Sequence, residues 1–239
     1  MSTRSVAPAV RVGGWSLILA ALLFLGVFSY LAATFDYPDV LDRPAGEVLP
    51  RLIALGDTGR AVWVLYGLVP LLLVPAGIGV EAALRRAAPG ATRAASLFGT
   101  LCGFSMLLGL MRWPSIQWEL GKTWTDADGS QRAALGAVFT GLNSYLGNFI
   151  GEFVGELFLN LFFALTAYAM LCSPSRPRWA GYGGLAVAII GFLAMFRNAV
   201  AAVGPIAEIN NLVLPVWLLV LGWLLLRQVP GEAEGETLG

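Results

Sequence analysis

The sequence predicts an all-α polytopic membrane protein, a six-transmembrane-helix bundle with no second domain. Three observations support this class: 57% of the 239 residues are hydrophobic, only 13% are charged, and the mean hydropathy is +0.74. A soluble domain carries about 25% charged residues. A helix that crosses a bilayer needs about 20 mostly apolar residues, and six runs of the chain are long enough.

The six apolar runs divide the chain into a transmembrane domain and two short ends. The runs cover residues 15–33, 61–84, 94–113, 146–171, 180–203 and 206–226. We therefore expect a cytoplasmic N-terminal segment at 1–12, the six-helix domain at 13–228 and a disordered cytoplasmic tail at 229–239. The first run is longer than the apolar part of a cleaved signal peptide, about 7–15 residues, so we expect it to remain as the first span.

Arginines in the short connections predict an N-in, C-in orientation. Arg85, Arg86 and Arg93 lie between the second and third runs, and Arg176 and Arg178 lie between the fourth and fifth. Neither connection contains an acidic residue. Because lysine and arginine in short loops mark the cytoplasmic side, the first and third connections should face outward.

Both long outer connections are expected to contain short amphipathic helices. In the first, Asp42 can cap a helix that has Pro44 in its opening turn and ends at Gly56. Its apolar stripe would consist of Val48, Leu49, Leu52 and Ile53.

In the second outer connection, Trp118 and Trp124 suit the depth of the lipid headgroups. A helix should then begin near Ser130 and run straight into the fourth span. The residues expected to face inward are Leu135, Val138, Phe139 and Leu142.

A polar stripe within the fourth run marks the candidate site. Its members recur at every fourth position: Asn148, Glu152, Glu156 and Asn160. Carboxylates within a bilayer cost about 2.5–3.5 kcal/mol each on insertion scales, so they face protein or water. Small residues occupy the adjoining face, namely Gly147, Gly151 and Gly155. Such residues let another helix approach closely, within the chain or between chains.

Charged residues of other spans lie at a matching depth. The full set of ligand- or ion-binding candidates is Arg112, Asn148, Glu152, Glu156, Arg197 and Glu208. In the structural interpretation, Arg112 and Arg197 neutralise the two glutamates of the fourth span and fix the helix register. In the functional interpretation, the outer half holds a polar site for a small molecule, a lipid headgroup or a cation.

Missing residue types exclude most enzyme classes. The chain has no histidine and only two cysteines, which excludes a histidine-ligated haem or zinc site and a Ser-His-Asp triad. Lysine plus arginine equals aspartate plus glutamate, 15 each, so charge gives no reason to expect nucleic-acid binding. We expect no catalytic residues, no metal and no cofactor.

Three functions remain open at this stage. The first is a non-enzymatic binding or regulatory protein of the membrane, and the second is a small secondary transporter that uses Glu152 or Glu156. The third, an intramembrane lipid-modifying enzyme, is disfavoured because no nucleophile and base form a visible pair. Expected partners are the lipid bilayer, a small-molecule, lipid-headgroup or cation ligand, and a second copy or another membrane protein.

Several motifs occur in the same order in one known family. They are residues 35–41 (Phe-Asp-Tyr-Pro-Asp-Val-Leu), residues 108–114 (Leu-Gly-Leu-Met-Arg-Trp-Pro), Tyr145, Gly147, Gly151, Glu152, Gly155, Arg178 and Trp179. The chain resembles a family of bacterial integral membrane proteins known only as a domain of unknown function. This resemblance implies a six-helix protein of the bacterial inner membrane and transfers no activity. Asn143 stands where some relatives have histidine.

Overall fold

The computed structural model describes residues 7–227, and its main elements are six membrane-spanning helical stretches. The spans are α1 (Pro8–Phe35), α3 (Gly56–Leu68) with η2 (Val69–Leu72) and α4 (Leu73–Leu84), α5 (Pro89–Met111), α8 (Gly155–Cys172), α9 (Arg178–Ala194) and α10 (Gly204–Leu226). Six stretches of the described residues are long and apolar enough to cross a membrane, which confirms the predicted fold class. Because α1 already begins at Pro8, it includes part of the predicted segment 1–12. The predicted tail at 229–239 lies outside the described residues.

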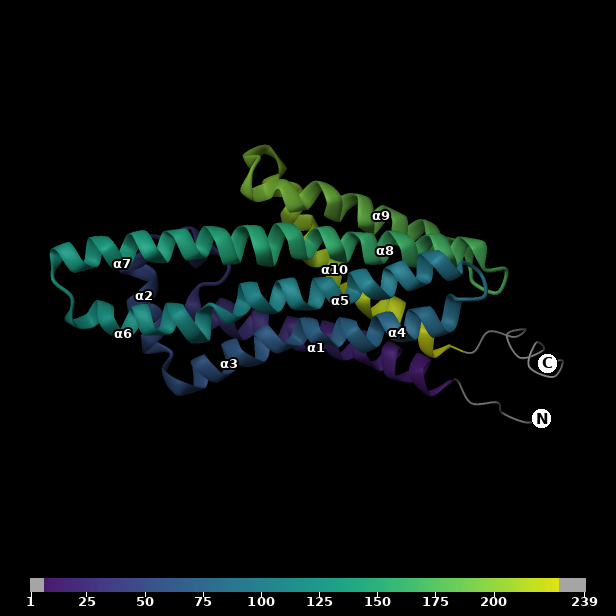
Figure 1. Ribbon diagram of the computed structural model, residues 1–239, viewed down its shortest axis with the longest axis horizontal. Helices are drawn as coiled ribbons and strands as arrows, with labels where there is room; N and C mark the ends of the chain where they lie inside the picture. The colour runs from purple at the N-terminus through teal and green to yellow at the C-terminus, as the bar shows by residue number, and fades with distance from the viewer. Residues whose placement is uncertain (1–6, 228–239) are drawn as a thin grey trace.

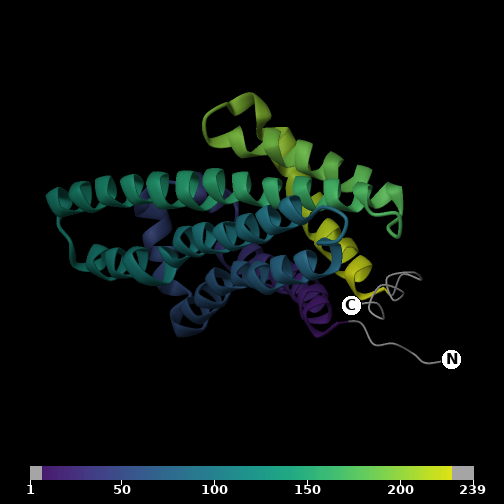
Figure 2. The ribbon, with the colours of Figure 1, turned by 45° about the vertical axis from the view of Figure 1, so that its right-hand side comes forward.

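The six spans form a closed ring. Each span packs against its neighbours in the sequence, and α1 also packs against α10 (Figure 1). A Cβ atom on Gly13 would lie 2.7 Å from Gly79 Cα, so these two glycines let α1 and α4 touch through their backbones. Figure 2 shows α10 crossing the bundle obliquely. Buried side chains such as Leu17, Phe162 and Leu221 fill one half of the ring.

The two ends of the bundle differ in composition. Helix α1 begins and α10 ends on one side, which we call the inner end (Figure 1). Large aromatic side chains are exposed near this end on four spans: Trp15, Tyr168, Trp179, Tyr182 and Trp223. Tryptophan and tyrosine gather at membrane–water interfaces, so these residues mark one boundary of the hydrocarbon layer. The opposite side, which holds α2 (Ala45–Ala54), α6 (Trp118–Asp126) and α7 (Gly129–Leu142), we call the outer end.

The first outer connection confirms the predicted helix but not its cap. The N-cap of α2 is Pro44, without a side-chain hydrogen bond, whereas Asp42 ends a preceding 3-10 turn, η1 (Asp39–Asp42). The prediction of Asp42 as the cap is therefore wrong, because the extended backbone at Arg43 separates it from the helix. Gly56 follows the helix with φ of +62°, as predicted for a C-terminal glycine. The predicted stripe packs inward at Val48, Leu49, Leu52 and Ile53.

The second outer connection runs without a break into the fourth span. Asp128 caps α7 and accepts a hydrogen bond from the Gln131 backbone N–H, which confirms a helix start near Ser130. The helix continues through a π-helical segment, η4 (Asn143–Val154), into α8. A second π-helical segment, η3 (Trp113–Gln117), joins α5 to α6. Such wide turns are rare and are frequent at functional sites.

Helix α7 packs less completely than its apolar residues predict. Phe139 is buried, Leu135 and Leu142 are partly buried, and Val138 is 47% exposed. The inward orientation predicted for Val138 is therefore wrong. The hairpin of α6 and α7 projects beyond the end of α9 (Figure 1), so fewer elements are available to cover α7. Trp118, expected at headgroup depth, is buried in the cluster that packs under α2.

Candidate functional site

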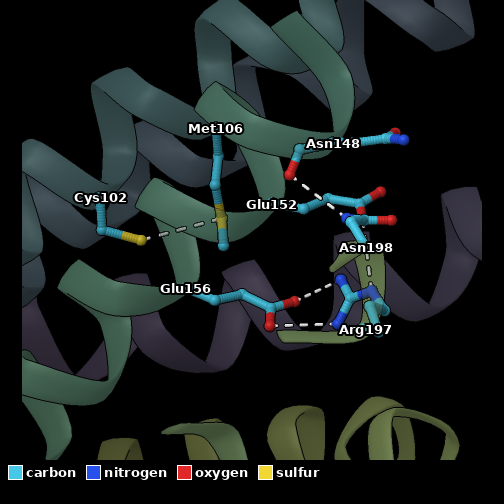
Figure 3. A network of polar contacts seen from close by, with 7 residues as sticks. All are labelled: Cys102, Met106, Asn148, Glu152, Glu156, Arg197 and Asn198. Carbon is cyan, nitrogen blue, oxygen red and sulfur yellow. Dashed lines mark hydrogen bonds and ion pairs between the residues drawn. The ribbon is translucent and has the colours of Figure 1, made fainter. Parts of the chain in front are cut away.

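Arg197 joins both glutamates of the polar stripe. It lies in the 3-10 turn η5 (Met195–Asn198), which ends the fifth span. Its Nη1 and Nη2 atoms donate to the two oxygens of Glu156, with Nη1 3.1 Å from Oε2, and Nε donates to Glu152 Oε2 at 3.2 Å (Figure 3). Paired hydrogen bonds between arginine and a carboxylate are among the strongest in proteins. The predicted role of Arg197 as partner of the two glutamates is therefore observed.

Asn198 ties the same turn to the fourth span. Its Nδ2 atom donates to Glu152 Oε2 at 2.7 Å and to the Asn148 carbonyl oxygen at 3.2 Å. Asn148, a predicted site residue, thus contributes its backbone, while its side chain points away from the network (Figure 3). The other oxygen, Glu152 Oε1, accepts no hydrogen bond from any described residue.

The cluster is more open at Glu152 than at Glu156. The side chain of Glu152 is 27% exposed and that of Arg197 is 21% exposed, compared with 8% for Glu156. One turn further inward, Leu159 and Asn160 are each 3% exposed. The accessible group of the cluster is therefore Glu152, and packed side chains lie below Glu156.

Arg112 occupies a separate and almost completely buried position. Its Nε and Nη2 atoms donate to Asn143 Oδ1 at 3.1 and 3.0 Å, and Nη1 donates to the Gly109 carbonyl oxygen. Asn143 in turn donates to the Leu41 carbonyl oxygen at 3.3 Å. Arg112 forms no direct ion pair among residues 7–227, so the expected contact with a glutamate is wrong, although its charge interacts with that of Glu152 over a longer distance. The cause is position: Arg112 immediately precedes η3, and Asn143 beside it begins η4.

The glycines beside the polar stripe make this close approach possible. A Cβ atom on Gly147 would lie 2.5 Å from Arg112 Cζ, and one on Gly109 would lie 2.5 Å from Gly151 Cα. Gly155 likewise lies against the Met106 side chain. The glycine face of the fourth span thus packs within the chain, against α5.

Glu208 is not part of the cluster. It is exposed near the start of α10, and it forms no hydrogen bond or ion pair with another described residue. Conversely, the list of sequence-based candidates omits Asn143 and Asn198. Asn198 follows Arg197 directly, so its position was the available signal. For Asn143 the available signal was the family resemblance, in which some relatives have histidine at this position.

The charged groups of the cluster can form ion pairs and hydrogen bonds with a ligand. Within the described part of the chain, no group of three or more cysteine, aspartate or glutamate side chains could hold a metal ion. A carboxylate with one oxygen free of hydrogen bonds can accept a proton or a cationic donor.

Comparison with known proteins places the chain in a family. A family model described as a domain of unknown function, DUF4386, matches residues 12–227. The chain belongs to this family. No curated protein matches, and no solved structure matches. Membership in the DUF4386 family confirms the resemblance that the sequence motifs carry, and it assigns no activity.

Proposed function

We propose that this DUF4386 protein is a non-enzymatic binding or regulatory protein that takes a small cation at Glu152, from the outer end of the bundle. The observation that carries the proposal is the free Oε1 atom of Glu152, on a side chain that is 27% exposed. Hydrogen bonds to charged groups are worth about 1.5–3 kcal/mol, so an ammonium group would gain measurably there.

The charge of the cluster also supports a cation. Two carboxylates share one guanidinium, and Arg197 makes two hydrogen bonds to Glu156 but only one to Glu152. When both carboxylates are ionised, the two glutamates and Arg197 carry one negative charge in excess, which the more distant charge of Arg112 offsets in part. Glu152 is the less completely neutralised of the two, and a cation would balance it.

The proposal includes the location and orientation of the chain. Both termini would lie in the cytoplasm of a bacterium, with the protein in its inner membrane, because the arginine-rich short connections lie at the inner end. Glu152 would then face the extracytoplasmic side.

Thermal unfolding of the purified protein tests this function. Methylammonium chloride is titrated in neutral detergent, with sodium chloride keeping the ionic strength constant. A ligand that binds only the folded state raises the unfolding midpoint, so we expect a rise for the native protein and none for Glu152→Gln. Glu208→Gln is the matched control, because Glu208 is an exposed carboxylate outside the cluster, and it should keep the rise.

Two results would overturn the proposal: no rise in the midpoint for the native protein, or the same rise for Glu152→Gln. A folded Glu152→Gln protein, checked by its circular dichroism spectrum, makes the second result decisive.

Transport remains the alternative, and the packing below the cluster favours binding. Leu159 and Asn160 are almost fully buried one turn inward of Glu156, and the Asn160 amide lies against Gly191 of α9. Reconstituted vesicles with a pH-sensitive dye inside distinguish the two roles. Because neutral methylamine crosses lipid and takes up a proton inside, protein-free vesicles are the baseline. We expect no proton flux above that baseline when methylammonium is added outside, and an additional flux abolished by Glu156→Gln would establish transport instead.

A further inference from the structure

The connection between the fifth and sixth spans exposes mainly apolar side chains, together with Asn198. It consists of η5 and η6 (Ala201–Val203), and its exposed side chains include Phe196 at 42% and Val200 at 46%. Arg197 is the only charged residue between α9 and α10, and its guanidinium turns inward to the glutamates. A loop in water would instead expose polar side chains.

The depth of this connection matches the outer boundary of the hydrocarbon layer. Asn198 bonds to the Asn148 carbonyl, and residue 148 lies 20 positions before Tyr168 of the inner aromatic residues. At 1.5 Å per residue this separation is about 30 Å, slightly less where the helix is wide, and the hydrocarbon layer is about 30 Å thick. Asn148 therefore lies at the outer boundary of the hydrocarbon layer. Glu152, four residues nearer the inner end, lies about 6 Å inside this boundary.

The two spans beside this connection expose apolar side chains. On α9, Ile189 is 60% exposed, and on α10, Leu212 is 74% exposed. Phe196 packs edge-on against Phe153 with ring centroids 5.3 Å apart, and Phe153 lies next to Glu152 in the sequence. Apolar surface suited to acyl chains thus continues up to the polar groups.

We propose that the ligand of this site is the ammonium headgroup of a phospholipid from the leaflet at the outer end. The inference rests on the proposed function and names its ligand class. The ammonium group donates to Glu152 Oε1 in competition with water, while the acyl chains lie along the exposed faces of α9 and α10. Asn198 and Arg197 hold Glu152 Oε2, which leaves Oε1 for the headgroup.

Lipid retention in nanodiscs tests the inference. The protein is reconstituted in equal amounts of phosphatidylethanolamine and phosphatidylglycerol, extracted in mild detergent, and the bound lipid is measured by native mass spectrometry. We expect phosphatidylethanolamine to be enriched over phosphatidylglycerol for the native protein and for Glu208→Gln. Glu152→Gln should lower that enrichment about tenfold, the effect of losing one charge-assisted hydrogen bond.

The outcomes separate this inference from the proposed function. Equal retention of both lipids by the native protein overturns the lipid inference, and so does enrichment that survives Glu152→Gln. If methylammonium still raises the unfolding midpoint in that case, the cation site stands and its ligand is a free amine. If neither probe responds to Glu152→Gln, both proposals fall.

Discussion

Arg112 and Arg197 both bond to the continuous helix of the fourth span and are satisfied in opposite ways. Arg112 is 5% exposed and donates to neutral oxygens of Asn143 and Gly109. Arg197 is 21% exposed and donates to carboxylates on the neighbouring span. An amide side chain and one backbone carbonyl satisfy the Arg112 guanidinium, whereas Arg197 holds two carboxylates at a partly open surface.

The difference separates a structural contact from a candidate binding site. The Arg112–Asn143 contact joins α5 to η4 and reaches the first outer connection through the Leu41 carbonyl. Both side chains are almost fully buried, and the Arg112 guanidinium lies against Gly147. The Arg197 cluster keeps a free carboxylate oxygen at Glu152. Only the second arrangement has an unused polar atom that a ligand could reach.

Removing each arginine should give the largest losses of stability and test the difference between the two sites most directly. Arg197→Met leaves Glu156 buried without its partner, and a buried charge left in this way costs about 3–5 kcal/mol of stability. Arg112→Met leaves neutral acceptors, at about 1–3 kcal/mol. Chemical unfolding in detergent measures both. Adding Glu156→Gln to Arg197→Met should restore part of the loss, and equal losses for the two single variants would contradict this comparison.

A methyl group on Gly147 should affect the Arg112 contact next. A Cβ there would lie 2.5 Å from Arg112 Cζ, so Gly147→Ala forces the guanidinium to move, and overpacking of this kind costs about 1–3 kcal/mol. On the same continuous helix, a Cβ on Gly141 would meet nothing within 4 Å. Gly141→Ala should therefore be neutral or stabilise by up to about 1 kcal/mol. The same unfolding assay compares the two, and equal stabilities would show that Arg112 adjusts freely.

Alkaline titration measures the pKa of Tyr37, which responds to the charges of Glu152 and of both arginines. Burial raises the pKa of the Tyr37 hydroxyl above 10.0, and the Glu152 carboxylate raises it further, against smaller opposing effects from Tyr66, Arg112 and Arg197. Because the folded state favours the neutral phenol, the stabilising contribution is complete below pH 10 and disappears as the pH rises through the higher folded value. We expect part of the tyrosinate absorbance of the native protein to develop above the ordinary tyrosine range, with Tyr37 among the groups that titrate late. Tyr37→Phe should reduce this late absorbance by one residue's signal, and an unchanged titration would count against the partly buried position of Tyr37.

The smallest effect is expected at Asp128, outside both arginine sites. Its pKa lies below the usual 3.8, chiefly because its carboxylate accepts a hydrogen bond from the Gln131 backbone N–H. This contribution is present above pH 3.8 and decreases as the pH falls through the lower folded value. Asp128→Ala should speed amide exchange in the first turn of α7 and leave cation binding unchanged. Asp126→Ala, at the end of α6, is the control and should leave that exchange unaltered.

Much of the fold follows from local pattern, and the site follows only in part. Apolar length predicts the six spans, and Gly56 and Ser130 correctly mark the end of one outer helix and the start of another. The pairing of Arg197 with both glutamates follows from depth and charge. The partner of Arg112 does not, because an arginine that has carboxylates at matching depth gives no sign that it prefers an amide.

The sequence by itself determined the membrane class, the number of spans and which charged residues of the spans need partners. These features depend on composition and on positions along one helix. The tertiary structure alone decided that Arg112 binds Asn143, that Glu208 stands apart and that one oxygen of Glu152 remains free. Those outcomes depend on how α5, η4 and η5 meet in space. The packing of glycines against a neighbouring helix fixes the relative position of these elements, and the sequence of one segment alone does not specify that position.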